Sequence, residues 1–188
     1  KLVRITSICL SGTRTRVSLD GLMSDAFAVN TGLRQGDGLS PLLFNLVLEK
    51  VVRALENVPC GVNLGGNIKC LGYADDIDLL GETREDVRRA CAELLTVARR
   101  VGLEINGDKT EYLVMTRNRQ DEAALEVEGL RFRNVSEFRY LGTVVTSDND
   151  TNYEVASRIQ SGNRSLFALG YILRSRELSR RAKLLAYN

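Results

Sequence analysis

The chain has 188 residues with a net charge of +2, and its 44% hydrophobic and 27% charged residues are the proportions of a folded domain with its own core. No apolar run is long enough to span a bilayer and no signal-peptide pattern opens the chain, so we expect an intracellular protein, nuclear or cytoplasmic, that is neither secreted nor bound to a membrane. Histidine is absent and the four cysteines are scattered, which argues against zinc knuckles and disulfide frameworks.

The first 30 residues are expected to contain one helix and two strands. Residues 1–10 fit the end of a helix that stops at Ser11-Gly12. Residues 16–20 and 26–30 are typical of two strands joined by a loop. A helix that opens the chain without a capping residue indicates a piece of a longer protein.

A glycine-rich loop over residues 32–38 follows, in which the backbone can approach a ligand closely. Gln35 adds an amide that can donate and accept hydrogen bonds beside a base or a sugar. Ser40 is the predicted N-cap and Pro41 the first residue of a helix that reaches residue 57, and we expect its apolar N-terminal half to be buried. Taken alone, the loop also fits an ordinary strand-to-helix connection.

Residues 68–80 contain two short apolar runs around a pair of adjacent carboxylates. The spacing predicts a β-hairpin with Asp75 and Asp76 at its tip. Two carboxylates on one tight turn repel each other unless a cation lies nearby. Mg²⁺ is such a cation, because it takes oxygen ligands and needs only one or two protein carboxylates beside substrate phosphates and water. For the dipeptide alone, a solvated Asp-Asp turn is the alternative.

The rest of the chain is expected to alternate helices and short strands. Thr83 can cap a helix that runs to residue 101 and closes at Gly102. Strands are expected at 103–106 and 112–115, with a turn at Lys109, and residues 117–124 are expected to form a loop. A hairpin around Gly129, a strand and turn over 138–146, and helices over 153–173 and 179–186 complete the prediction.

The C-terminal segment is the basic part of the chain. From Thr151 onward seven Arg or Lys residues stand against two Glu residues, a local charge of +5 that leaves the first 150 residues at −3. This excess suggests contact with the phosphate backbone of nucleic acid.

Four motifs occur in an order that resembles one enzyme family. The tetrapeptide Tyr73-Ala74-Asp75-Asp76 resembles the catalytic box of reverse transcriptases. The run before it is similar to the template- and nucleotide-contacting box, especially that of non-LTR, LINE-like retrotransposons: Gly32-Leu33-Arg34-Gln35-Gly36-Asp37-Gly38-Leu39-Ser40-Pro41-Leu42-Leu43-Phe44. Residues 102–106 with Lys109-Thr110 resemble the next box of the family, and Tyr140-Leu141-Gly142-Thr143 resembles the one after it.

The resemblance implies an α+β fold and a polymerase activity. It implies the palm of a right-hand polymerase, an antiparallel sheet backed by helices, over residues 1–150, and the beginning of a basic helical thumb over residues 151–188. The implied enzyme is an RNA-directed DNA polymerase that uses two metal ions, Mg²⁺ or alternatively Mn²⁺, to add nucleotides to a primer. Its implied partners are an RNA template, a DNA primer, dNTPs and the remainder of a polyprotein, with an attached endonuclease left open.

The resemblance also assigns roles to individual residues. Asp75 and Asp76 would be the catalytic metal ligands. Nucleotide and template contacts would come from Arg34, Gln35, Gly36, Tyr73 and Lys109, and for Lys109 a solvated turn lysine is the alternative. The primer grip would be formed by Tyr140, Leu141 and Gly142. Gly38 departs from the family, which has a proline or a bulky residue there, and this change loosens the loop.

One catalytic carboxylate of the family has no counterpart in this sequence. The family's first catalytic Asp lies on a strand before the helix that opens the chain, and Asp20 and Asp25 belong to the segment after that helix. We therefore expect a fragment without the N-terminal fingers and that Asp, which does not extend a primer by itself. The alternative is a degenerate palm that acts only as a nucleic-acid-binding or interaction module.

Overall fold

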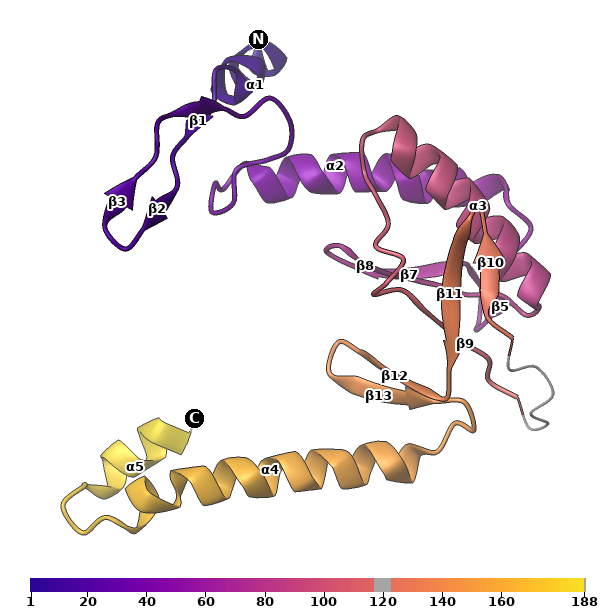
Figure 1. Cartoon of the computed structure of the whole chain (residues 1–188). Coiled ribbons are helices and arrows are strands. Elements are labelled where there is room, and N and C mark those ends of the chain that lie inside the picture. Colours follow the sequence, from indigo (N-terminus) through magenta and orange to yellow (C-terminus); the bar gives the residue numbers. More distant parts are fainter. Residues whose placement is uncertain (117–122, 188) are drawn as a thin grey trace. The chain divides into compact units, whose positions relative to one another are not determined.

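The computed structural model describes residues 1–116 and 123–187 (Figure 1). These residues form an α+β chain that divides into two compact units, Lys1–Glu104 and Ile105–Asn188. The α+β class predicted from the sequence is therefore confirmed. The described strands form separate sheets of two or three strands, where the sequence analysis expected a single antiparallel sheet.

The first unit opens with helix α1 (Leu2–Leu10) and two short strand pairs. Strand β1 (Arg14–Thr15) pairs with β4 (Phe27–Ala28), and β2 (Ser18–Leu19) pairs with β3 (Leu22–Met23). The predicted strand at 16–20 was therefore only partly right. The chain reverses at Asp20 and Gly21, both with positive φ, so this segment forms a hairpin of its own.

Helix α2 (Ser40–Arg53) continues into the 3-10 helix η1 (Ala54–Asn57). The predicted cap was wrong: the Ser40 hydroxyl donates to the Arg34 carbonyl at 2.6 Å, and the Asp37 carboxylate accepts from the Leu39 N–H at 2.9 Å. The predicted burial was also wrong, because Leu42 and Leu46 are 63% and 64% exposed. Only the C-terminal end of α2 reaches the core of this unit.

That core lies where the end of α2 and η1 pack against helix α3 (Arg84–Arg100) (Figure 1). The predicted cap is confirmed, since the Thr83 hydroxyl accepts from the Asp86 N–H and the Asp86 carboxylate accepts from the Thr83 N–H. Each buried aliphatic side chain stabilises the unit by about 1.5–3 kcal/mol. The buried apolar residues of this core are Val51, Leu55, Cys60, Ala90, Cys91, Leu94, Leu95 and Ala98.

Two hairpins lie between η1 and α3 in the sequence. Strand β5 (Val62–Asn63) pairs with β6 (Asn67–Ile68), and β7 (Cys70–Tyr73) pairs with β8 (Asp76–Leu79). An additional bridge joins Gly61 to Gly81. The hairpin predicted over 68–80 is thus confirmed.

The second unit contains a three-stranded sheet and a separate hairpin. The sheet has the order β10 (Leu125–Val127), β11 (Leu130–Val135), β9 (Glu111–Leu113), and the hairpin joins β12 (Glu137–Tyr140) to β13 (Thr143–Thr146). A turn at Glu128 and Gly129 makes β10 and β11 antiparallel, and β9 runs parallel to β11 on its other side. The buried apolar side chains of this unit are Tyr112, Leu125, Val127 and Phe132.

The predicted strand at 103–106 was wrong. The Asn106 side-chain oxygen accepts hydrogen bonds from the N–H groups of Asp108 and Lys109, and its carbonyl accepts from Thr110. Such a local Asn turn offers the backbone an alternative to a strand ladder. The predicted loop over 117–124 falls largely on residues 117–122, which lie outside the described residues.

Two helices end the chain. Helix α4 (Thr151–Arg174) begins after Asp150, whose carboxylate accepts from the Asn152 N–H at 2.9 Å. Helix α5 (Arg180–Tyr187) follows. Both predicted helices are confirmed to within two residues at their ends. Within the described ranges, no helix has the length and apolar character needed to cross a membrane.

Candidate active site

The two predicted catalytic carboxylates lie at the tip of the β7–β8 hairpin. Cys70 pairs with Leu79 at the base and Tyr73 pairs with Asp76 at the tip, so the turn consists of Ala74 and Asp75. Asp75 is therefore in the turn, and Asp76 is the first residue of the returning strand. The hairpin brings Tyr73, Asp75 and Asp76 together as the sequence predicted.

The turn itself has an unusual backbone. Ala74 has a φ of 53°, while Asp75 has no positive φ. A positive φ at the first of two turn residues is the pattern of a type II′ turn, in which glycine is usual. A residue other than glycine held at such a positive φ costs about 1–3 kcal/mol. Residues held in this way occur often at functional sites, so the turn is a candidate on geometry as well as on sequence.

The carboxylates of Asp75 and Asp76 are exposed and have no partner in the described part of the chain. Neither accepts a hydrogen bond or forms an ion pair there. Tyr73, opposite Asp76, is 65% exposed. Two uncompensated carboxylates on adjacent residues provide oxygen ligands for a hard cation.

Asp78 is a third carboxylate on this hairpin that the sequence analysis missed. Burial raises the pKa of Asp78 above its ordinary value, and the neighbouring Asp76 carboxylate raises it further. Residues two apart on a strand share a face, so the spacing of Asp76 and Asp78 in the sequence already indicated that their side chains lie on the same face of β8. No group of three or more His, Cys, Asp or Glu residues that could hold a metal occurs among the residues described.

The loop before α2 forms a tight turn at Gln35 and Gly36. Gly36 has a φ of 86°, and the Asp37 N–H donates to the Arg34 carbonyl at 3.4 Å, the pattern of a type II turn that needs glycine at its third position. The Arg34 guanidinium donates to the Cys9 carbonyl at 3.2 Å and to the Thr13 hydroxyl at 2.9 Å.

Arg34 therefore ties the end of α1 to the loop, while Gln35 is exposed. In the residues that the structure describes, no hydrogen bond connects this loop with the Asp75–Asp76 turn.

The remaining predicted site residues belong to the second unit. Lys109 is exposed, in the turn that Asn106 organises. Tyr140 ends β12, and Leu141 and Gly142 form the two-residue turn of the β12–β13 hairpin. Both turn residues have positive φ, 48° and 84°, which identifies a type I′ turn.

Helix α4 contacts this second hairpin next to its turn. The Glu154 carboxylate accepts from the Val144 N–H at 2.8 Å and also from the Arg158 guanidinium. Arg158 in turn donates to the Thr143 hydroxyl at 2.9 Å. The Val144 N–H and the Arg158 guanidinium hold the pKa of Glu154 below its ordinary value, so this link is ionic at neutral pH.

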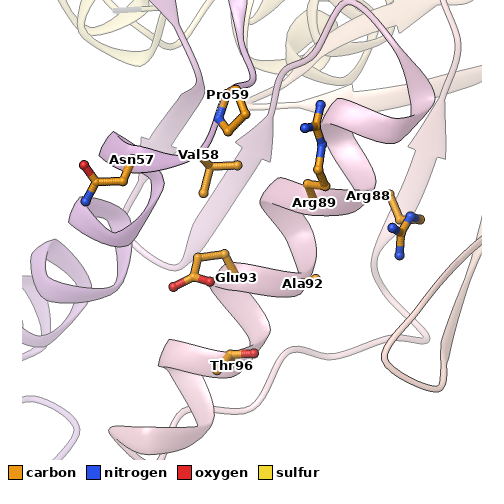
Figure 2. Close-up of a pocket in the computed structure, with 8 residues that line it drawn as sticks. All are labelled: Asn57, Val58, Pro59, Arg88, Arg89, Ala92, Glu93 and Thr96. Carbon is orange, nitrogen blue, oxygen red and sulfur yellow. The ribbon is translucent and has the colours of Figure 1, made fainter.

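The surface hollows in the described residues include one in each unit. The first, of about 340 Å³, lies between the end of η1 and α3 and is lined by Val58, Pro59, Arg88, Arg89 and Glu93 among others (Figure 2). Its arginines are paired with acids of the same helix, and no predicted site residue lines it. The second, of about 300 Å³, lies between Gly142 and α4 and includes Arg139 and Arg158.

Comparison with known proteins decides the family. Residues 4–145 match the family described as reverse transcriptase (RNA-dependent DNA polymerase). The chain belongs to the reverse transcriptase family. The match includes the hairpin with Asp75 and Asp76, the loop before α2 and the β12–β13 turn.

Similar proteins are Pol polyproteins of R2 retrotransposable elements. One is the retrovirus-related Pol polyprotein from type-2 retrotransposable element R2DM of Drosophila melanogaster, 31% identical over 147 residues, or 72% of this chain and 14% of that protein. Another, from type-1 retrotransposable element R2 of Nasonia vitripennis, is 34% identical over 129 residues, or 62% of this chain and 12% of that protein. A third, from type-1 element R2 of Popillia japonica, is 32% identical over 97 residues, or 50% of this chain and 16% of that protein.

The predicted membership of the reverse transcriptases of non-LTR retrotransposons is confirmed by the family match and these relatives. The matched segments span less than a fifth of the length of these relatives. The roles given to individual residues stay predictions.

Proposed function

We propose that this chain is the palm, with the start of the thumb, of an RNA-directed DNA polymerase encoded by a retrotransposon. The palm covers residues 1–150 and the basic helical thumb covers residues 151–188. The observation that carries the proposal is the exposed, uncompensated pair Asp75 and Asp76 on a hairpin turn, in a chain of the reverse transcriptase family. The basic excess after Thr151 supports a thumb that meets nucleic acid.

Asp75 and Asp76 are the residues that would hold divalent metal, Mg²⁺ or alternatively Mn²⁺. The donor set fits, since both side chains offer exposed carboxylate oxygens without an ion-pair partner among the described residues. The chemistry that bound metal would supply there is activation of the primer hydroxyl and neutralisation of charge on the phosphates. Because the described residues include no third ligand in this cluster, the remaining ligands would be substrate phosphates and water.

The other predicted residues act on the substrates, which are an RNA template, a DNA primer and dNTPs. Tyr73 lies beside the primer end, as its place opposite Asp76 supports. Gln35 and Gly36 contact the incoming nucleotide and the template, and Lys109 neutralises the leaving pyrophosphate. Arg34 contributes to this group by fixing the loop. The turn of Leu141 and Gly142, with Tyr140, forms the primer grip.

Primer extension on an RNA template with Mg²⁺ and four dNTPs tests this proposal. The assay is made on this chain and on the longest natural protein that contains it, with Asp75→Asn as the test variant and Asp20→Asn as the matched control. Asp20 also occupies a two-residue hairpin turn, but the other turn residue is Gly21, so this turn has no second adjacent carboxylate.

We expect extension by the longest protein and by its Asp20→Asn variant, and a loss of more than about 10²-fold in rate with Asp75→Asn. Equal rates for both variants would overturn the assignment of Asp75. Salt-dependent binding of the primer–template without extension by any form would favour a nucleic-acid-binding module instead.

A further inference from the structure

The side chain of Lys69 makes three hydrogen bonds to one short segment of backbone. Its ammonium nitrogen donates to the carbonyls of Leu55 at 2.8 Å, Glu56 at 2.7 Å and Val58 at 2.7 Å. An ammonium group has three protons, so these carbonyls satisfy it completely. All three belong to η1 or the residue that ends it, where the regular hydrogen-bond pattern of a helix stops. The Leu55 carbonyl also accepts from the Val58 N–H at 3.1 Å, and the Val58 carbonyl from the Cys60 N–H at 3.0 Å.

Lys69 also closes the hairpin that bears the carboxylates. It immediately precedes β7, and its carbonyl accepts from the Leu80 N–H at 2.8 Å, one step below the pair of Cys70 with Leu79. The backbone of Lys69 therefore belongs to the base of the hairpin, while its side chain belongs to the end of the α2–η1 helix. One residue connects the two elements.

The surroundings of this connection leave little room for movement. The Asn67 side chain donates to the Cys60 carbonyl at 3.0 Å, and Gly61, with a φ of 109°, bridges to Gly81. A Cβ at Gly61 would lie 2.3 Å from the Asn67 side-chain oxygen, so only glycine fits there. The base of the β7–β8 hairpin is thus tightly packed, in contrast to its exposed tip.

We propose that Lys69 is a positioning residue that fixes the Asp75–Asp76 turn relative to helix α2, and through α2 relative to the loop at Gln35 and Gly36. The proposal rests on the proposed function, since it assigns Lys69 a role for the same metal-binding turn. Lysine suits this role because one nitrogen reaches three converging carbonyls, and its charge is favourable at a helix C-terminus. Arginine keeps the charge, but its planar fork cannot direct three bonds from one nitrogen.

The test compares Lys69→Met, which keeps the length of the side chain and removes its donors, with Lys69→Arg and with Lys50→Met as the matched control. Lys50 is exposed on α2, and its substitution by Met removes the same positive charge. Hydrogen–deuterium exchange is measured for the amides of 70–80 and of α3, and Mn²⁺ affinity is measured by electron paramagnetic resonance.

For Lys69→Met we expect faster exchange over 70–80, unchanged exchange in the centre of α3, and Mn²⁺ affinity about tenfold lower, the usual size of an effect on a residue behind a metal site. Lys69→Arg is expected to show a smaller change of the same kind, and Lys50→Met none. If Lys69→Met does not fold, the comparison of Lys69→Arg with the parent decides whether Lys69 positions the turn.

Equal Mn²⁺ affinity and equal hairpin exchange in the parent and the Lys69 variants would overturn the proposal. So would exchange that rises equally in α3, because Lys69 would then support general stability only. Absence of Mn²⁺ binding in the parent would count against the metal site of the proposed function. In that case hairpin exchange alone decides whether Lys69 holds the turn.

Discussion

The two hairpins β7–β8 and β12–β13 have equal strand and turn lengths, but they are attached to neighbouring elements at opposite ends. Each has strands of four residues and a two-residue turn, and each turn places a residue other than glycine at positive φ, Ala74 in the first and Leu141 in the second. The β7–β8 hairpin is held at its base by Lys69. The β12–β13 hairpin is held beside its turn by Glu154 and Arg158 of α4.

The difference concerns which part of each hairpin stays accessible. Attachment at the base leaves the carboxylates of Asp75 and Asp76 open to a cation and to substrates, without an ion-pair partner in the described residues. Attachment beside the turn instead couples Leu141 and Gly142 to the first turns of α4. If the proposed roles hold, metal binding depends on the rigidity of the first unit's core, and the primer grip depends on α4.

The largest expected effect comes from Leu55→Ala. Leu55 is 1% exposed, and its carbonyl is one of the three that bind Lys69. Removing a buried leucine side chain costs about 2–5 kcal/mol in free energy of unfolding. We expect exchange over 70–80 to accelerate strongly while exchange over 137–146 stays unchanged, measured by hydrogen–deuterium exchange. Acceleration in both hairpins alike would remove the distinction between them.

The thiols of the first unit give the next largest effect. Burial raises the pKa of Cys91 from its ordinary 9.0 to about 11, and burial also raises the pKa values of Cys60 and Cys70. At pH 8 the thiolate fraction of Cys91 is about 100-fold below that of an ordinary thiol.

We therefore expect a disulfide reagent to label exposed Cys9 first and Cys91 only on unfolding, as followed by mass spectrometry. Lys69→Met should accelerate labelling of Cys60 and Cys70 and leave Cys91 slow. Rapid labelling of Cys91 in the folded parent would contradict the packing of the core.

Glu154→Gln should loosen the second hairpin only. The variant loses the charge that accepts from the Val144 N–H and from Arg158, and we expect exchange at Val144 to rise on the order of tenfold. Glu177→Gln on the segment after α4 is the matched control.

The Glu154 effect should also depend on pH. Because the pKa of Glu154 is lowered by folding, its stabilising contribution is present above the ordinary value of 4.5 and is lost as pH falls through the folded-state pKa. The parent and the variant should therefore converge in acid. A difference between them that grows as the pH falls would contradict the link.

The smallest expected effect is that of Asp78→Asn. The pKa of Asp78 is raised by folding, so its ionisation destabilises the folded state as pH rises above the ordinary value of 3.8. The variant should melt about 1–2 °C higher than the parent at pH 7 and equally at pH 3, by circular dichroism. A lower melting temperature at pH 7 would show that the Asp78 carboxylate stabilises the hairpin.

Elements with local signals were predictable from the sequence. Thr83 with the apolar spacing after it predicted helix α3, and the two short apolar runs around Asp75 and Asp76 predicted the β7–β8 hairpin. For residues 138–146 the sequence predicted a strand and a turn, and the structure shows a hairpin. Other elements were decided by local hydrogen bonds that compete with the expected structure. The Asn106 side chain accepts a hydrogen bond that forms a turn where a strand was expected. The Ser40 hydroxyl donates to the preceding loop, where a helix cap was expected.

The candidate site shows the same division between local and distant signals. The pair Asp75 and Asp76 was visible as a motif. The bonds of Lys69 reach back 11 to 14 residues, and no sequence pattern indicated them. The exposure of Leu42 and Leu46 was not predictable either, since burial of a helix face depends on the partner that packs against it.

An Mn²⁺ titration followed by electron paramagnetic resonance measures divalent-ion binding by the Asp75–Asp76 turn. The parent, Asp75→Asn, Asp76→Asn and the control Asp20→Asn are titrated under identical conditions, and Mg²⁺ is then added as a competitor. We expect one site in the parent and in Asp20→Asn, displaced by Mg²⁺, with affinity about tenfold lower or lost in the Asp75 and Asp76 variants. Identical titrations for all four proteins would show that the hairpin tip is a solvated turn and not a metal site.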